Sequence, residues 1–130
     1  MYSTSTGAGS AGSITVKTPT LNISDSGEIS SSASVTGHGG SIDINVANLT
    51  MNSGAVISSA STGTGDAGSI SLTIADKLES RNSTITTEST QADGGDITIT
   101  TGFLTYLINS SITATVGGGP QTTGGNIRIN

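Results

Sequence analysis

Residues 94–99, Gly-Gly-Asp-Ile-Thr-Ile, are one copy of the short phrase that decides the fold. The phrase is a small residue, a glycine, a polar residue, an isoleucine, any residue and an aliphatic residue. Its leading isoleucines follow one another at intervals of 28, 28, 27 and 30 residues. Self-similarity at such a period is typical of a solenoid. The five copies are AGSITV (11–16), GGSIDI (39–44), AGSISL (67–72), GGDITI (94–99) and GGNIRI (124–129).

Two further apolar anchors recur in each repeat. A second isoleucine follows each of the first four leading isoleucines after 15 residues, at Ile29, Ile57, Ile85 and Ile112. Between them, at offsets of 7, 7, 8 and 7, stand Leu21, Leu49, Leu78 and Leu104. We therefore expect the length variation to fall in one loop per repeat, after the third anchor, as solenoids commonly allow.

Apolar residues alternate with polar ones around each anchor, as in Ile14-x-Val16 and Leu21-x-Ile23. A period of two indicates strands and not helices. We predict an all-β fold, a right-handed parallel β-helix with three short strands per coil of about 28 residues and about four to five coils. The chain forms one domain, with repeats at approximately 13–40, 41–68, 69–95 and 96–125 and a partial repeat at 126–130.

Stacked repeats place equivalent residues above one another in columns. The leading isoleucines and the 15-residue isoleucines should form buried ladders, and small residues should line the inside of the third strand, at Ser31, Ser59, Thr87 and Ala114. Residues that tolerate a left-handed backbone should form the corner before that strand, at Ser26, Gly54, Asn82 and Asn109. Small or turn-forming residues separate the first two strands, at Pro19, Ala47, Ala75 and Gly102.

The fourth repeat breaks the pattern with Phe103-Leu104-Thr105-Tyr106-Leu107-Ile108. We expect Leu104 and Tyr106 to point inward, and Phe103, Leu107 and Ile108 to occupy outward or turn positions. One interpretation is a bulged coil with its own local cluster, or with a contact to an adjacent loop. The other is an exposed patch that contacts a partner. The candidate contact residues are Phe103, Tyr106, Leu107 and Ile108.

Composition and charge exclude several classes of function. The net charge of −5 and only four scattered Lys and Arg residues argue against a nucleic-acid partner, because phosphate neutralisation needs clustered cations. The chain has no cysteine, hence no disulfide framework and no thiolate metal site. No apolar run is long enough for a membrane-spanning helix. Residues 1–4 do not resemble an export signal, so a targeting region would lie outside the given sequence.

No catalytic, cofactor or metal constellation emerges from the sequence. The nine acidic residues are scattered, and Asp43 and Asp96 belong to repeats that are not adjacent. Asp93-Gly-Gly-Asp96 is similar to part of a calcium-binding nonapeptide repeat, but occurs once and not every nine residues. His38 is the single histidine and lies in a glycine-rich loop. We therefore predict a protein that is not an enzyme and that needs no cofactor.

The repeated phrase resembles the repeats of filamentous-haemagglutinin-like exoproteins, the large secreted partners of bacterial two-partner secretion systems. The resemblance covers residues from about Ala11 to Asn130. It implies an adhesin shaft that is secreted to the bacterial cell surface through an outer-membrane transporter. It also implies a receptor or glycan on a host or neighbouring cell as partner. The chain has the character of a piece of a longer shaft, whose uncapped ends invite end-to-end self-association.

Two other functions compete with a structural or adhesive shaft. A carbohydrate-binding or carbohydrate-active module would use the exposed aromatic residues Phe103 and Tyr106. An ice-binding β-helix would need regular outward threonine columns. The outward columns predicted for the third strand instead read Ser30, Ser58, Thr86 and Thr113, then Ser32, Ala60, Glu88 and Thr115.

Overall fold

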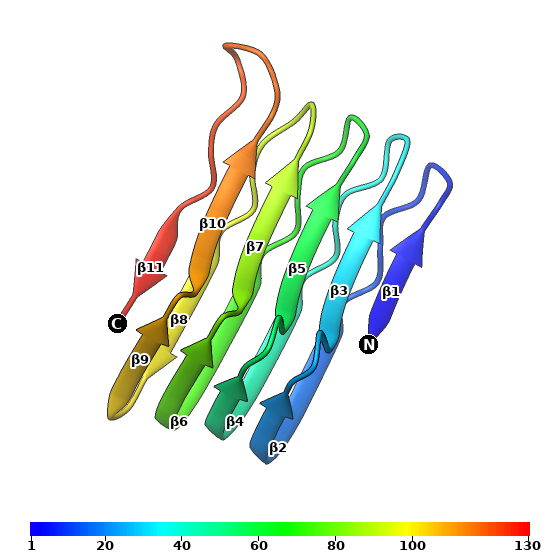
Figure 1. Ribbon diagram of the computed structural model, residues 1–130. Coiled ribbons are helices and arrows are strands. Elements are labelled where there is room, and N and C mark those ends of the chain that lie inside the picture. The colour runs from blue at the N-terminus through cyan, green and yellow to red at the C-terminus, as the bar shows by residue number, and fades with distance from the viewer.

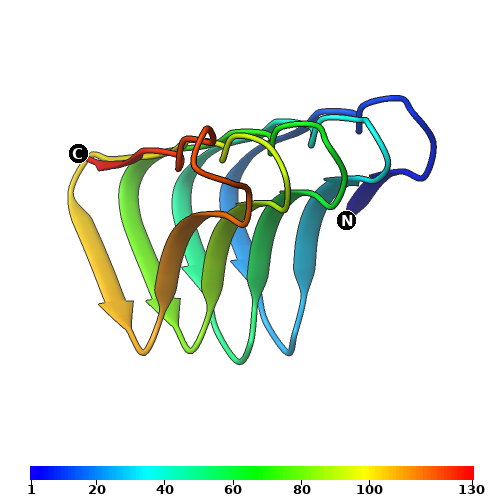
Figure 2. The same ribbon diagram turned by 90° about the horizontal axis from the view of Figure 1, so that it is seen from above.

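The computed structural model describes residues 1–130 as eleven β-strands and no helix. All strand pairs are parallel, and coils of about 28 residues stack into a β-solenoid of about five turns (Figure 1). The predicted parallel β-helix is therefore confirmed. Seen from above, successive coils repeat one outline, and the two termini lie at opposite ends of the stack (Figure 2).

Two sheets form the walls of the solenoid. The five-stranded sheet contains, in spatial order, β1 (Tyr2–Ser5), β3 (Glu28–Ala33), β5 (Val56–Ser61), β7 (Thr84–Ser89) and β10 (Ser111–Val116). The six-stranded sheet contains β11 (Ile127–Ile129), β8 (Ile97–Thr101), β6 (Ile70–Arg81), β4 (Ile42–Met51) and β2 (Ile14–Ile23), with β9 (Leu104–Ile108) also paired to β6. Each coil thus crosses one sheet, turns a corner and returns along the other.

The prediction of three separate strands per coil is wrong for the first three coils. β2, β4 and β6 each run through the two apolar anchors that we had assigned to separate strands. Pro19, Ala47 and Ala75 lie within these long strands and do not end them, because the residues before and after each of them are paired with the neighbouring coil. Only the fourth coil is divided, at Gly102-Phe103, into β8 and β9.

A one-residue bulge separates the first two coils from the later ones. Val46 pairs with Ile74, but Asn48 pairs with Lys77, so β6 contains one extra residue. β6 is two residues longer than β4, by the bulge residue and by Arg81, which pairs with Ile108. The corner that follows is two residues shorter: residues 24–27 and 52–55 form it in the first two coils, and 82–83 and 109–110 in the next two. The 15-residue spacing between the isoleucine ladders is therefore preserved.

The predicted left-handed corners are confirmed. The φ angles there are 62° at Ser26, 83° at Gly54, 49° at Asn82 and 46° at Asn109. The two longer corners each have a second left-handed residue, Asp25 or Ser53. Asparagine and glycine adopt this backbone at the lowest steric cost, which explains their recurrence at these positions.

The core consists of the predicted aliphatic ladders. The six-stranded sheet buries Ile42, Ile70 and Ile97 in one column and Ile44, Leu72 and Ile99 in the next. Ile57 and Ile85 face them from the five-stranded sheet. Burial of each such side chain contributes roughly 1.5–3 kcal/mol, so these ladders supply most of the stabilisation of the stack.

Hydroxyl groups line the other half of the interior, as predicted. Ser31 and Ser59 are buried, and their Oγ atoms donate to the carbonyl oxygens of Gly12 and Gly40, both at 2.9 Å. Thr87 Oγ1 donates to the carbonyl of Gly95 at 2.6 Å. No buried side-chain nitrogen or oxygen lacks a hydrogen-bond partner. These hydrogen bonds connect the glycine phrase across the coil to β3, β5 and β7.

The glycines of the repeated phrase stack so closely that there is no room for a side chain. A Cβ added to Gly68 would lie 2.3 Å from the carbonyl oxygen of Gly40, and one added to Gly95 would lie 2.0 Å from that of Gly68. Real Cβ atoms do not approach backbone oxygen this closely. The phrase therefore requires glycine because adjacent coils touch backbone to backbone.

Replacement of Ile70 by alanine should lower the free energy of unfolding by about 2–5 kcal/mol, because it opens a cavity in the middle of a buried ladder. The next residue, Ser71, points outward, and Ser71→Ala should change stability by less than about 0.5 kcal/mol. Chemical denaturation of both variants measures the difference. Equal stabilities would contradict the assigned inward face.

Gly95→Ala should destabilise the chain by about 1–3 kcal/mol or prevent folding, since the methyl group would collide with the preceding coil. Gly119→Ala is the matched control, because a Cβ at Gly119 would have no heavy atom within 4 Å. Thermal unfolding followed by circular dichroism compares the two variants. A Gly95 variant as stable as the Gly119 variant would show that the coils are not in this close contact.

Candidate functional site

The irregular residues of the fourth coil form the largest group of exposed apolar side chains on the molecule. We call Phe103, Leu104, Tyr106 and Leu107, together with the partly buried Ile108, the fourth-coil patch. Phe103 is 82% exposed, Leu104 42%, Tyr106 43% and Leu107 39%. Phe103 lies at the corner between β8 and β9, and the other four belong to β9. Of our two interpretations, the one with an exposed patch agrees with this exposure.

The orientations that we predicted within β9 are wrong for three residues. Leu104 pairs with Lys77 and Tyr106 with Glu79, and both point outward. Leu107 pairs with the buried Ser80 and therefore faces the interior at the end of the stack. The outward or corner positions predicted for Phe103 and Ile108 are correct.

The bulge in β6 is the physical cause of this difference. The bulge adds one residue before Leu78, which therefore lies eight residues after Ile70. The residue eight positions after Ile97 is Thr105, so Thr105 and not Leu104 pairs with Leu78. Thr105 is partly buried, and its hydroxyl lies 2.8 Å from that of Thr101. The fourth coil thus places a threonine in a leucine column and a leucine on the surface.

A row of alternating charges on β6 borders the patch. Lys77 Nζ lies 2.8 Å from Glu79 Oε2, and Arg81 Nε lies 2.7 Å from Glu79 Oε1. The hydrogen bonds from Lys77 and then Arg81 lower the pKa of Glu79 to about 2. Glu79 therefore stays ionised and holds both cations in place.

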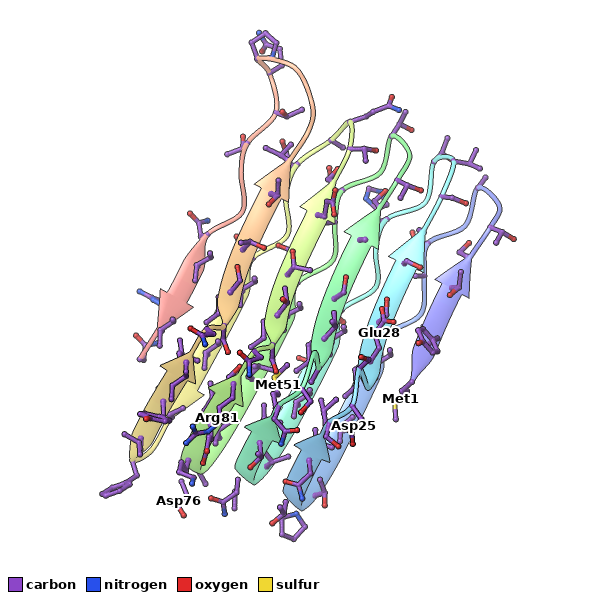
Figure 3. The ribbon with its side chains drawn as sticks, in the orientation of Figure 1. Met1, Asp25, Glu28, Met51, Asp76 and Arg81 are labelled. Carbon is purple, nitrogen blue, oxygen red and sulfur yellow. The ribbon has the colours of Figure 1, made fainter.

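Tyr106 connects the patch to this row. The Arg81 guanidinium carbon lies 5.2 Å from the centre of the Tyr106 ring, within the range of a cation–π interaction. Figure 3 labels Arg81 and Asp76 on β6, beside β9. The resulting surface combines an aromatic ring, apolar side chains and an oriented guanidinium group, a composition enriched at binding surfaces.

The polar loop residues singled out in the sequence have structural contacts. His38 Nδ1 accepts a hydrogen bond from the backbone N–H of Asp66 at 3.0 Å, and Asp66 Oδ1 accepts one from Asp93 N–H at 3.0 Å. Asp93 Oδ1 accepts from Thr123 N–H at 2.7 Å. Asp96 Oδ1 accepts from Asn126 N–H at 2.8 Å. These side chains connect each loop to the next coil.

The structure contains no group of three or more His, Cys, Asp or Glu residues placed to hold a metal ion. Asp43 and Asp96 stand in different columns, since Asp43 pairs with Ser71 while Asp96 precedes β8. One open hollow of about 400 Å³ lies at the last coil and is lined by Asp96, Thr98, Asn126, Ile127 and Arg128. No helix long and apolar enough to cross a membrane is present.

Sequence reasoning identified the patch but missed its charged border. Lys77, Glu79 and Arg81 were read as scattered charges, although they alternate with Leu78 and Ser80 at the period of a strand. That spacing places all three on one face, where opposite charges pair. The period of two in residues 77–81 was therefore the sequence signal for this charged row.

Comparisons with protein-family models, with curated proteins and with solved structures found no match.

Glu79→Gln should destabilise the chain at neutral pH, with an effect that disappears in acid. The pKa of Glu79 is about 2 in the folded chain and ordinarily 4.5, so its ionised form stabilises the fold above pH 4.5. That contribution declines as the pH falls and is lost near pH 2. Denaturation midpoints of both chains between pH 7 and pH 2 should therefore converge, and high salt should reduce the difference.

Glu88→Gln is the control, because Glu88 is an exposed strand carboxylate without an ion pair. Its midpoint should follow that of the parent chain at every pH. A Glu79 variant that also followed the parent would contradict the ion-pair row.

Proposed function

We propose that this chain is a structural and adhesive shaft segment of a secreted bacterial cell-surface protein, of the filamentous-haemagglutinin type. Its role is to present the fourth-coil patch on a rigid rod, without catalysis. The regular ladders of both sheets support the shaft role, because every coil is hydrogen-bonded to its neighbours along the whole axis. The repeat phrase supports the family assignment.

The observation that carries the adhesive part is the reversed polarity of β9. Leu104 and Tyr106 point outward, while Thr105 occupies the inward leucine column. A strand that served only the core would have the opposite arrangement. Exposed apolar side chains bordered by polar ones mark interaction sites on soluble proteins.

The proposed partner is a receptor or glycan on the surface of a host or neighbouring cell. The parent protein would reach that location through a dedicated outer-membrane transporter, as the filamentous-haemagglutinin-like exoproteins that it resembles do. Phe103 and Tyr106 supply apolar contact area at low entropic cost, and Arg81 supplies hydrogen-bond donors beside them. This surface suits a ligand with both apolar faces and polar groups.

A carbohydrate-binding module is the second candidate, favoured by the exposure of both aromatic residues in one coil. Sugar rings present apolar C–H faces to aromatic side chains, and hydroxyl groups to charged ones. An ice-binding face has less support, because the outward columns of the five-stranded sheet include Glu28, Val56 and Glu88 among their hydroxyl residues.

The test is binding of the labelled chain to a glycan array, to immobilised matrix proteins and to cultured host and bacterial cells. We expect saturable binding to at least one of these, weakened at least about tenfold by the double change Phe103→Ser and Tyr106→Ser. Tyr2→Ser removes an exposed aromatic ring from β1, at the other end of the stack, and should leave binding unchanged.

Binding to glycans alone would favour the carbohydrate module over the protein receptor. Binding that persists in the double variant would place the contact elsewhere on the rod. Absence of binding to every probe would overturn the adhesive role.

A further inference from the structure

Two of the four cationic side chains of the molecule lie in one row on β6. Lys77 and Arg81 are on the same face of this strand, whereas Lys17 and Arg128 lie alone on β2 and β11. Glu79 stands between the first two, so two cations and one carboxylate give this row a net charge of +1. The net charge of the whole chain is −5, and the row is therefore a local exception to its acidic character.

The row faces sideways, away from the axis of the solenoid. β6 is paired with β4 on one side and with β8 and β9 on the other, and side chains on a strand stand roughly perpendicular to the sheet. The Lys77 and Arg81 side chains are 40% and 47% exposed, but that of Glu79 only 22%. Asp76, the other acid on β6, lies at the end of this segment away from Arg81 (Figure 3). The charge presented to solvent is thus mainly positive.

The Arg81 guanidinium group is held in one orientation by contacts on two sides. Its Nε–H donates to Glu79 Oε1 at 2.7 Å, and its central carbon lies 5.2 Å from the centre of the Tyr106 ring. A guanidinium group has five N–H donors in one plane, so the bond through Nε leaves those of the two Nη atoms for a further acceptor. Two such donors side by side match the two oxygens of a carboxylate.

The side chains on either side of the row differ in kind. β9 presents the apolar Leu104 and Tyr106 toward solvent. On the opposite side the outward positions carry amides and hydroxyls, at Asn48 and Thr50 of β4 and at Thr20 and Asn22 of β2. Adjacent strands are about 4.8 Å apart, so this face extends roughly 14 Å from β9 to β2. It offers apolar contacts, cations and amides in that order.

The size and charge of this face restrict the class of ligand. A stable protein–protein interface buries about 800 Å² on each partner and involves about 20–30 residues, far more than the patch and the row contain. A polyanion needs many clustered cations, and the row has only Lys77 and Arg81. A small ligand with a single negative charge fits both limits. Sugars supply the apolar C–H faces and the hydroxyl groups that the two flanks of the row can contact.

We propose that the ligand of the fourth-coil patch is a short glycan with one carboxylated sugar, whose carboxylate binds Arg81. This proposal rests on the adhesive function proposed above and names the ligand class of that same surface. The apolar faces of the sugar rings pack against Leu104 and Tyr106, and their hydroxyl groups bond to the amides of β4. Lys77 adds a second positive charge on the same side of the ligand.

Matched glycans test the role of the carboxylate. Each probe oligosaccharide is used with its free carboxylate, as the methyl ester, and without the acidic sugar. One series carries a sialic acid and the other a uronic acid, because both sugars have the same acidic group. In at least one series the parent chain should bind the free acid at least about tenfold more tightly than the other two forms, and high salt should reduce this preference.

Three variants of the chain test the role of Arg81. Arg81→Gln should lower the affinity for the free acid to that of the ester. Arg81→Lys should bind with intermediate affinity, since it keeps the charge but loses the paired donors. Arg128→Gln is the matched control, because it removes the same charge from an exposed position on β11 and should bind as the parent does. Circular dichroism verifies that all three variants are folded.

Two kinds of failure can be distinguished. Equal binding of acid, ester and neutral forms, or an Arg81→Gln chain that binds the acid as the parent does, would overturn this proposal. The adhesive function would still stand if the double change at Phe103 and Tyr106 weakened binding. Tighter binding of a polysulfated chain or of an acidic peptide would also overturn the proposed ligand class. Absence of binding to every probe would overturn the ligand class and the adhesive function together.

Discussion

Parallel pairing of each residue with its equivalent one coil away is the constraint on which the whole structure depends. It places isoleucine on isoleucine, serine on serine and glycine on glycine, so each column must tolerate its own residue type in contact with itself. Aliphatic side chains meet this demand by close packing, and hydroxyl groups meet it by bonding to carbonyl oxygens across the coil. Glycine meets it by having no side chain where backbones touch.

The surface follows from the same constraint. Charges repeated in a column would repel, and the chain instead pairs opposite charges along one strand, at Lys77, Glu79 and Arg81. Most outward positions carry serine, threonine or asparagine, which stack without cost. The fourth-coil patch is the main departure from this polar surface. Its Tyr106 ring lies against the guanidinium group of Arg81, the last residue of the charged row.

The ladders, the corners and the inward hydroxyls could be predicted because spacing alone determines them. Ile14 and Ile42 share a column because 28 residues form one coil, whatever the details of the turns. The side-chain directions in β9 could not be predicted in this way. A residue moved from the corner into the bulge of β6 leaves the spacing of the isoleucines unchanged but reverses the side chains between the bulge and the corner. Residue type then misled, since Leu104 matches Leu78 in kind while Thr105 matches it in position.

The hydroxyl groups inside the coil have a consequence for how stability varies with temperature. Ser31, Ser59, Thr87 and the glycine carbonyls that they contact make much of the interior polar. Unfolding exposes apolar surface, which raises the heat capacity, and polar surface, which lowers it. A solenoid with this interior gains less heat capacity on unfolding than a fully aliphatic core of equal size. Its stability curve is therefore flatter, and its free energy of unfolding differs less between cold and warm surroundings.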